Sequence, residues 1–411
     1  MRVLLAHKFH ELTGGAEVFF HETEKALRAA GHDTWMLATG KKQPGTPDNV
    51  TLWDAPAYDA PGLLARAASV PPAIYNPRNK ARMAALLDQF KPDLLHVFAT
   101  NVHLSPAIFS AAHDRRIPVV MSCNDYKHIC PNYKLFHHQK ICTECQGGKF
   151  WRAVANKCCK ENLPLSVASM TEAYIHNSLK VYEKIAHFTF SSEFMAHKTE
   201  EFWQGKPFSW SKMRNPFNSA AVTATDKYDG YGLYFGRLID EKGVDRIVQA
   251  ADRIDNFPIK IVGNGPDQQR LEKMVAERGL TNIEFLGPRW GAELDAVLEN
   301  ARFVIVPSLW HENFPYVINQ SFAAARPVIG AHRGGITELV EHGQRGLIFD
   351  PDNIEELAQC IRALAQDIQL ARSMGQRAKQ WSDSVFSPDV FLKEIETAYD
   401  TAFQTYRNHR G

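Results

Sequence analysis

Two short segments carry side chains suited to binding a diphosphate and a sugar. Residues 236–243 (Gly-Arg-Leu-Ile-Asp-Glu-Lys-Gly) place Arg237 and Lys242 after an apolar run and before an amphipathic stretch. The planar donor fork of arginine and the compact charge of lysine both suit phosphate oxygens. Residues 307–312 (Pro-Ser-Leu-Trp-His-Glu) place Glu312 after a second apolar run. If both runs are parallel strands, two cations and a carboxylate meet at one sheet edge, as a site for a sugar diphosphate requires.

Glycines mark two further turns. Gly14 and Gly15 follow the first predicted strand and open a helix, where backbone amides can approach a phosphate. The alternative is a simple chain turn, the more ordinary role of glycine. Residues 263–266 (Gly-Asn-Gly-Pro) resemble half of a dinucleotide fingerprint, but they lack the third glycine and the acidic residue that closes the first βαβ unit. The sequence therefore argues against NAD binding.

These segments need elements to position them, and two blocks of alternating short apolar runs and amphipathic stretches predict two parallel sheets covered by helices. The first block has predicted strands near 3–7, 34–38, 94–98, 119–122 and 188–191, with helices at about 17–30, 78–90, 104–114 and 193–203. The second has predicted strands near 232–235, 259–262, 283–286, 303–306, 328–329 and 346–349. A last helix is predicted from Val390 to about Tyr406.

Size and composition agree with two globular domains. The chain has 411 residues, 45% of them hydrophobic and 23% charged, with a net charge of +1 that gives no case for nucleic-acid binding. No apolar run reaches the roughly 18 residues needed to span a bilayer. The first residues are predicted to form a buried strand and not a secretory signal, so a cytoplasmic location is expected. We expect an N-terminal domain at 1–215 with a Cys-rich insertion at about 123–160, a second domain at 216–386, and a returning helix at 387–411.

Taken together, the motifs resemble the retaining, nucleotide-sugar-dependent glycosyltransferases of family four. The resemblance covers nearly the whole chain, and it implies that the domain at 1–215 binds the acceptor and that the domain at 216–386 binds the nucleotide sugar. It implies the GT-B fold, an α/β architecture in which two Rossmann-like, doubly wound domains face an interdomain cleft and the C-terminal helix packs back on the N-terminal domain. It rests on the segments already quoted and on 285–287 (Phe-Leu-Gly), 327–330 (Pro-Val-Ile-Gly), 334–336 (Gly-Gly-Ile) and 346–349 (Gly-Leu-Ile-Phe).

The resemblance also implies roles for individual residues. Arg237 and Lys242 match the pair that clamps the donor diphosphate, and Glu312 matches the first glutamate of the E-x7-E motif, which faces the donor sugar. Because the cations replace a divalent ion, no cofactor is expected for catalysis. An alternative role for Glu312 is a favourable interaction between its negative charge and the positive N-terminal end of a helix dipole, worth about 0.3–1 kcal/mol. Further donor-binding positions are Gly14, Gly15, Gly236, Gly265, Asn313, Phe314 and Tyr316.

Two positions depart from the family pattern. The second glutamate of the motif is Gln320, whose amide can still bind a ribose hydroxyl. Where relatives commonly have His-Asp, this chain has Asn124 and Asp125, so any acid–base role of that histidine is lost and Asn124 is expected to orient the sugar. Asp125 and His7 are candidate auxiliaries. His96, on an apolar strand, is expected to be a buried, satisfied histidine.

Six of the seven cysteines lie between positions 123 and 159. Cys142 and Cys145 have the spacing of a zinc knuckle, and Cys130 and Cys158 complete a candidate four-thiolate set. The stretch 127–160 carries seven Lys or Arg and one Glu, charges that would stabilise such an anionic centre. The sequence leaves two hypotheses open: a structural zinc, or reduced thiols.

The same stretch interleaves its cations with aromatic residues. This pattern suits a membrane surface or an anionic lipid-linked acceptor, and the alternative is a charged, partly packed loop. A peripheral location at the inner face of a membrane is the corresponding expectation. The aromatic residues are Tyr126, Tyr133, Phe136, Phe150 and Trp151.

The predicted function is transfer of a sugar from a nucleotide-diphosphate sugar to a hydroxyl of a saccharide or lipid-linked acceptor, with retention of configuration, in surface polysaccharide or glycolipid synthesis. Because Asn124 and Gln320 depart from the pattern, a non-catalytic nucleotide-sugar-binding protein is an alternative. A nucleotide-sugar epimerase on the same fold is another.

Overall fold

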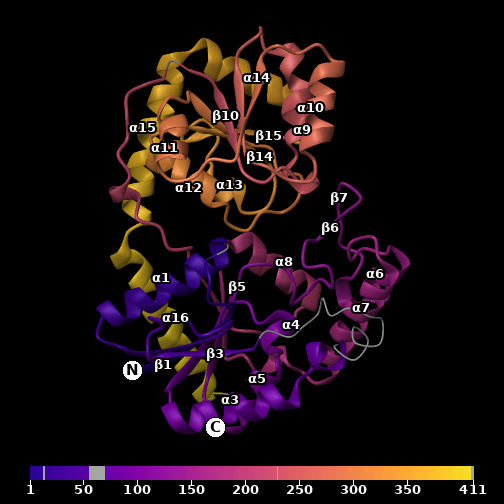
Figure 1. Cartoon of the computed structure of the whole chain (residues 1–411), viewed down its shortest axis with the longest axis vertical. Coiled ribbons are helices and arrows are strands. Elements are labelled where there is room, and N and C mark those ends of the chain that lie inside the picture. The colour runs from indigo at the N-terminus through magenta and orange to yellow at the C-terminus, as the bar shows by residue number, and fades with distance from the viewer. Residues whose placement is uncertain (13, 55–69, 229, 409–411) are drawn as a thin grey trace. The chain divides into compact units, whose positions relative to one another are not determined.

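A computed structural model describes residues 1–12, 14–54, 70–228 and 230–408. The chain divides into two compact units (Figure 1). Unit 1 comprises Met1–Leu135, Thr143–Pro216 and Pro388–Gly411, and unit 2 comprises Phe136–Cys142 and Phe217–Ser387. Over the described ranges, no helix has both the length and the apolar character needed to cross a membrane.

Unit 1 is built on a seven-stranded sheet in which every neighbouring pair is parallel, in the order β3-β2-β1-β4-β5-β8-β9. The strands are β1 (Arg2–Phe9), β2 (Asp33–Thr39), β3 (Val50–Trp53), β4 (Leu94–Val97), β5 (Val119–Cys123), β8 (His187–Phe190) and β9 (Trp210–Lys212). The helices are α1 (Gly15–Ala29), α3 (Pro77–Phe90), α4 (Asn101–Leu104), α5 (Ala107–Asp114), α6 (Arg152–Ala155), α7 (Leu163–Ser178), α8 (Glu193–Trp203) and α16 (Pro388–Asn408).

The central strands of this sheet are apolar on both faces because helices cover both sides. Residues 3–6 of β1 are fully buried. The sequence prediction located β1, β2, β4, β5 and β8 but missed β3 and β9, the short strands at the two edges of the sheet. Local caps set helix starts: α3 begins at Pro77 because the Asn76 side chain accepts hydrogen bonds from the Arg78 and Asn79 amides.

Helix α16 packs on unit 1, beside α1 (Figure 1). Its buried side chains include Phe391, Ile395 and Tyr399, which join the same apolar cluster as residues of β1 and β4. His96 Nδ1 lies 2.8 Å from the Tyr399 hydroxyl, and His96 Nε2 lies 2.8 Å from Ser122 Oγ. Burial lowers the pKa of His96 to about 3, so the ring is neutral. The prediction of a buried, satisfied histidine is confirmed.

Removing the hydroxyl that His96 contacts should destabilise unit 1. In Tyr399→Phe, a fully buried imidazole nitrogen loses its partner, and we expect the free energy of unfolding to fall by about 1–3 kcal/mol. Urea denaturation followed by circular dichroism measures this change. Thr397→Ala, which removes an exposed hydroxyl that donates to the Lys393 carbonyl of the same helix, is the control. Equal losses in both variants would contradict the prediction.

Unit 2 is built on a six-stranded parallel sheet in the order β12-β11-β10-β13-β14-β15. Its strands are β10 (Gly232–Phe235), β11 (Ile259–Val262), β12 (Ile283–Gly287), β13 (Phe303–Val306), β14 (Val328–Ala331) and β15 (Gly346–Phe349). Its helices are α9 (Val244–Ala250), α10 (Gln268–Glu277), α11 (Ala292–Glu299), α12 (Tyr316–Ala323), α13 (Ile336–Leu339), α14 (Ile354–Gln366) and α15 (Ile368–Val385). All six predicted strands are present. The hairpin of β6 (Phe136–His137) and β7 (Lys140–Ile141) groups with this unit.

Candidate functional site

The predicted donor residues of unit 2 lie at the point where the strand order reverses. Strand β10 pairs with β11 on one side and with β13 on the other, and the next strands continue outward from each. In open parallel sheets, ligands bind outside the carboxyl ends of the strands at such a switch point. Lys242 follows β10 and Glu312 follows β13, so both lie on loops at this edge.

Lys242 and Glu312 form an ion pair, with Nζ 2.6 Å from Oε1. The Ser308 hydroxyl donates to the same carboxylate oxygen at 2.7 Å. The Lys242 side chain is 21% exposed and that of Glu312 is 7% exposed, so the pair is open to a ligand mainly on the lysine side. Burial raises the pKa of Glu312, but the charge and hydrogen bond of Lys242 outweigh burial, and the net pKa is lowered. The carboxylate is therefore ionised at neutral pH.

This lowered pKa predicts a pH-dependent stability. A lowered folded-state pKa contributes stability above the ordinary value of 4.5, and that contribution disappears as pH falls through the folded-state pKa. The stability advantage of the wild type over Glu312→Gln should therefore be constant at neutral pH and shrink on acidification below the ordinary pKa of 4.5. Urea titrations across this range measure it. Glu293→Gln, at a carboxylate 70% exposed, serves as the control; an advantage that grows on acidification would contradict the prediction.

Two glycines hold the loops of this edge against each other. Gly243 has φ of 65°, and a Cβ there would lie 2.2 Å from the Pro307 carbonyl oxygen. Gly334 has φ of 57°, and a Cβ there would lie 2.3 Å from the Glu312 carbonyl oxygen. Only glycine permits these approaches in the left-handed region. The Leu309 amide also donates to the Glu241 carbonyl at 2.9 Å, so the two charged residues sit on loops fixed to one another.

Arg237 is exposed, and the Tyr234 hydroxyl fixes its backbone by donating to the Arg237 carbonyl at 2.7 Å. Gln320 lies half-buried on α12, which begins at Tyr316. Asn313 and Phe314 are buried, and Phe314 belongs to the apolar core of unit 2. Gly236 and Gly265 follow β10 and β11 and adopt extended, positive-φ conformations. The structure thus places all the predicted donor residues of unit 2 at or beside one sheet edge, while their roles stay predictions.

In unit 1, Gly14 immediately precedes α1, which begins at Gly15. The sequence prediction missed the contact between Glu17 and His7, in which Glu17 Oε1 lies 3.0 Å from His7 Nε2. The Ala99 amide donates to His7 Nδ1 at 3.3 Å, so both ring nitrogens are engaged. Burial lowers the pKa of His7, and its side chain is fully buried. This pair joins the glycine turn to the carboxyl ends of β1 and β4, and the auxiliary role of His7 stays a prediction.

Asn124 and Asp125 follow β5 and are both half-buried. Asp125 Oδ1 accepts a hydrogen bond from the Lys127 amide at 2.9 Å, which closes a tight turn. Burial raises the pKa of Asp125 above its ordinary value. The carboxylate is thus partly committed to its own turn, and the predicted catalytic roles of both residues stay predictions.

The predicted zinc set is not assembled in the structure. Within the part of the chain that it describes, no three His, Cys, Asp or Glu side chains form a group that could hold a metal ion. Cys130 donates to Asn132 Oδ1 at 3.0 Å. Hydrogen bonding between Cys158 and Cys159 raises the pKa of the first thiol and lowers that of the second to about 6. Cys142 groups with unit 2, whereas Cys145 groups with unit 1. The described residues thus give no support to a structural zinc.

The aromatic residues of the cysteine-rich stretch mostly point inward. Tyr126 and Phe136 are buried and Phe150 is half-buried, whereas Tyr133 and Trp151 are exposed. Most of these rings are therefore packed, as the alternative of a charged, partly packed loop predicted. Of these five rings, Tyr133 and Trp151 are exposed enough to contact a membrane.

Comparison with known families agrees with this architecture. A sequence model described as "Glycosyl transferases group 1" matches residues 218–381, and one described as "Glycosyl transferase 4-like domain" matches residues 14–155. An uncharacterised glycosyltransferase of Methanocaldococcus jannaschii is 32% identical over 170 residues, which is 41% of this chain and 48% of that protein. A GDP-mannose-dependent alpha-(1-6)-phosphatidylinositol monomannoside mannosyltransferase of Mycobacterium tuberculosis is 30% identical over 170 residues, 39% of this chain and 44% of that protein. The aligned region thus spans less than half the length of either relative.

Solved structures show the same fold over the whole chain. Sucrose-phosphate synthase from Thermosynechococcus elongatus aligns with a TM-score of 0.70 at 17% identity, covering 98% of this chain and 99% of that one. HepE from Anabaena, in complex with UDP and glucose, aligns with a TM-score of 0.66 at 18% identity, covering 98% and 100%. These likenesses confirm the predicted two-domain GT-B fold class. The two family matches, over residues 14–155 and 218–381, show that this chain belongs to the group 1 glycosyltransferases of family four.

Proposed function

We propose that this protein moves a sugar from a nucleotide-diphosphate sugar to a hydroxyl of a saccharide or lipid-linked saccharide, with retention of configuration. The observation that carries the proposal is the Lys242–Glu312 pair at the switch point of unit 2, with Arg237 exposed on the loop that bears Lys242. A lysine ammonium has three N–H donors, so it can hold the carboxylate and contact phosphate oxygens together.

The proposed reaction uses these charges on the leaving group. Arg237 and Lys242 neutralise the diphosphate as its bond to the anomeric carbon breaks. The departing phosphate oxygen takes the proton of the acceptor hydroxyl, whose oxygen bonds to the anomeric carbon on the same face. Glu312 faces the donor sugar and Gln320 binds a ribose hydroxyl. In unit 1, Asn124 orients the transferred sugar.

The comparisons support the donor and acceptor classes. HepE was solved with UDP and glucose, which favours a nucleotide-sugar donor for this chain. The mycobacterial relative acts on a phosphatidylinositol monomannoside, which favours a saccharide or lipid-linked acceptor and a role in surface polysaccharide or glycolipid synthesis.

The test has two stages. Thermal-shift measurements with UDP-, GDP- and ADP-sugars identify the donor, because a ligand that binds the native state raises the unfolding temperature. Incubation of that donor with a panel of glycoside acceptors then follows release of the nucleoside diphosphate and the anomeric configuration of the product by NMR. Release with a retained anomer is expected. Binding without release would identify a sugar-nucleotide-binding protein, and conversion of the donor without an acceptor would identify an epimerase; either would contradict the proposal.

A further inference from the structure

A cavity of unit 1 lies at the amino ends of two strands, away from the predicted site residues. Its volume is about 560 Å³, within the range of roughly 300–1,000 Å³ that small-molecule sites occupy. Ala186 directly precedes β8 and Ser209 directly precedes β9, and both line the cavity. Asn124 follows β5 at the opposite, carboxyl edge of the same parallel sheet. The cavity is therefore separate from the residues predicted to act on the sugar.

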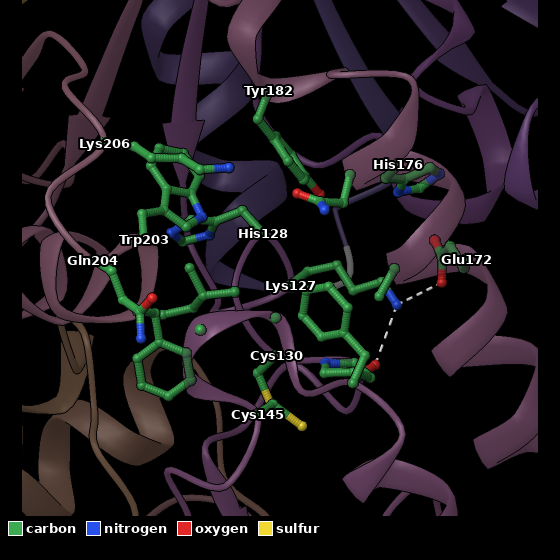
Figure 2. Close-up of a pocket in the computed structure, with 18 residues that line it drawn as sticks. Lys127, His128, Cys130, Cys145, Glu172, His176, Tyr182, Trp203, Gln204 and Lys206 are labelled. Atoms are coloured by element: carbon green, nitrogen blue, oxygen red, sulfur yellow. Dashed lines mark hydrogen bonds and ion pairs between the residues drawn. The ribbon is translucent and has the colours of Figure 1, made fainter.

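A smaller cavity of about 140 Å³ adjoins the larger one. Figure 2 shows Lys206 and Trp203 on one side of the smaller cavity and His176 on the other. Because five residues line both cavities, the two spaces meet at these residues, which we call the neck. The neck consists of His176, Asn177, Tyr182, Trp203 and Lys206.

The polar groups deep in the smaller cavity already have partners. Glu172 Oε2 accepts from Lys127 Nζ at 2.6 Å, and Lys127 also donates to the Pro131 carbonyl at 3.2 Å (Figure 2). His176 Nε2 donates to the Ile74 carbonyl at 2.7 Å, and burial lowers the pKa of this ring. These contacts orient α7, which buries Ser166, Glu172 and His176 and exposes Leu163, Val167 and Tyr174. The Lys127–Glu172 pair has no net charge, so it does not select a charged ligand.

The neck carries a positive charge without a counter-ion. Among the residues that the structure describes, the Lys206 ammonium and the Tyr182 hydroxyl have no hydrogen-bond or ion-pair partner. The other charged residues that line the larger cavity, Lys180 and Glu183, pair with each other at 3.5 Å. Burial lowers the pKa of His128 to about 3, so that ring is neutral. One ammonium beside a free hydroxyl favours an anionic group at the neck.

The walls of the larger cavity are aromatic. The Trp203 ring meets Phe208 edge to face, with centroids 4.9 Å apart and planes at 77°. Trp203 also meets Phe188, which is 1% exposed, at 5.5 Å and 73°. The Tyr182 ring lies 6.2 Å from that of Trp203. Rings packed in this way present faces and edges against which a further ring can stack or abut. The remaining apolar walls come from Val181, Ile185 and Pro207.

We propose that the larger cavity binds a small aromatic anion, with its ring against Trp203 and Phe208 and its carboxylate or phosphate at Lys206. A neutral sugar would leave Lys206 without a counter-ion. A flexible acyl chain would lose conformational freedom that a rigid ring does not have. This inference concerns binding within unit 1 and does not depend on the proposed reaction.

Isothermal titration calorimetry of the purified full chain tests the proposal with three probes. 2-Naphthoate carries a ring and a carboxylate, 2-naphthylmethanol carries the same ring without charge, and decanoate carries the carboxylate on a flexible chain. We expect saturable binding of one 2-naphthoate per chain and weaker binding of the other two. Absence of saturable 2-naphthoate binding, or equal affinity for decanoate, would overturn the proposal.

Two variants assign the binding to this cavity. Lys206→Ala, at an exposed side chain, should weaken 2-naphthoate binding about tenfold and leave 2-naphthylmethanol binding unchanged. Phe208→Ala should weaken both naphthyl ligands about fivefold or more, because each loses ring contact. Lys25→Ala, at a lysine 75% exposed on α1, is the matched control and should bind as the wild type does. Circular dichroism checks that each variant is folded.

The exposed arginine of unit 2 provides a further control, since an anion could also bind at the donor edge. Arg237→Ala should bind 2-naphthoate as the wild type does. Loss of binding in Arg237→Ala would place the anion in unit 2 and overturn the proposal. So would an equal effect of Lys206→Ala on the charged and the uncharged naphthyl ligand, since the ammonium would then not recognise the anionic group.

Discussion

Lys242→Ala should lower turnover more than tenfold, which corresponds to about 1.4 kcal/mol of activation free energy, and should also lower the free energy of unfolding. The substitution removes one cation from the proposed diphosphate contact and leaves the Glu312 carboxylate buried without its counter-ion. Breaking a buried pair in this way costs about 3–5 kcal/mol. Turnover at saturating donor and urea denaturation measure the two effects separately.

A double variant separates catalysis from stability. Lys242→Met/Glu312→Gln removes both charges together, so it should recover most of the lost stability while staying inactive. Lys273→Ala, at a lysine 74% exposed on α10, is the control for loss of a positive charge and should behave as the wild type. Full turnover in Lys242→Ala, or recovery of turnover in the double variant, would leave the proposed role of Lys242 untenable.

Arg237→Ala should also lower turnover more than tenfold, or about 1.4 kcal/mol in barrier, but with little change in stability. The difference from Lys242 follows from exposure, because the Arg237 side chain points to solvent and its loop is fixed through its backbone by Tyr234. Arg237→Lys keeps the charge without the planar fork and should lie between the wild type and Arg237→Ala. Steady-state kinetics and thermal unfolding of the three proteins measure this order.

Arg289→Ala is the matched control for Arg237→Ala, since Arg289 is an exposed arginine of unit 2 that pairs with Glu293 on the surface. Its turnover should equal that of the wild type. If both substitutions reduced turnover equally, the effect would come from net charge and not from a specific diphosphate contact.

The sequence was sufficient to predict that Lys242 and Glu312 lie at one edge of the unit 2 sheet. Apolar runs identified β10 and β13, and the carboxyl ends of parallel strands meet at one edge, so Lys242 and Glu312 had to lie near each other. The sequence did not indicate Ser308 as a partner of Glu312, because a hydroxyl before a turn has many local uses. Glu17 was overlooked for a similar reason, since its partner His7 is ten residues away on a strand.

The orientation of α7 could not be predicted from periodicity. The spacing of Leu163, Val167 and Tyr174 defines an apolar stripe, but a pattern alone assigns such a stripe to the core. Here the buried face was selected by the Lys127–Glu172 pair, whose partners are 45 residues apart. The zinc prediction for the cysteines met the same limit. Knuckle spacing gives the separation of two thiols along the chain, whereas metal ligation requires that side chains from distant turns meet in space.

The return of α16 to unit 1 has a consequence for dissecting the protein. A fragment ending at Pro216 would lack Phe391, Ile395 and Tyr399 and would leave the apolar surface beneath them open to water. Such a fragment is expected to aggregate, whereas the same fragment mixed with a peptide spanning residues 388–408 should regain solubility. The first unit is therefore completed only after the ribosome has made residues 388–408, which follow the bulk of the second unit in the chain.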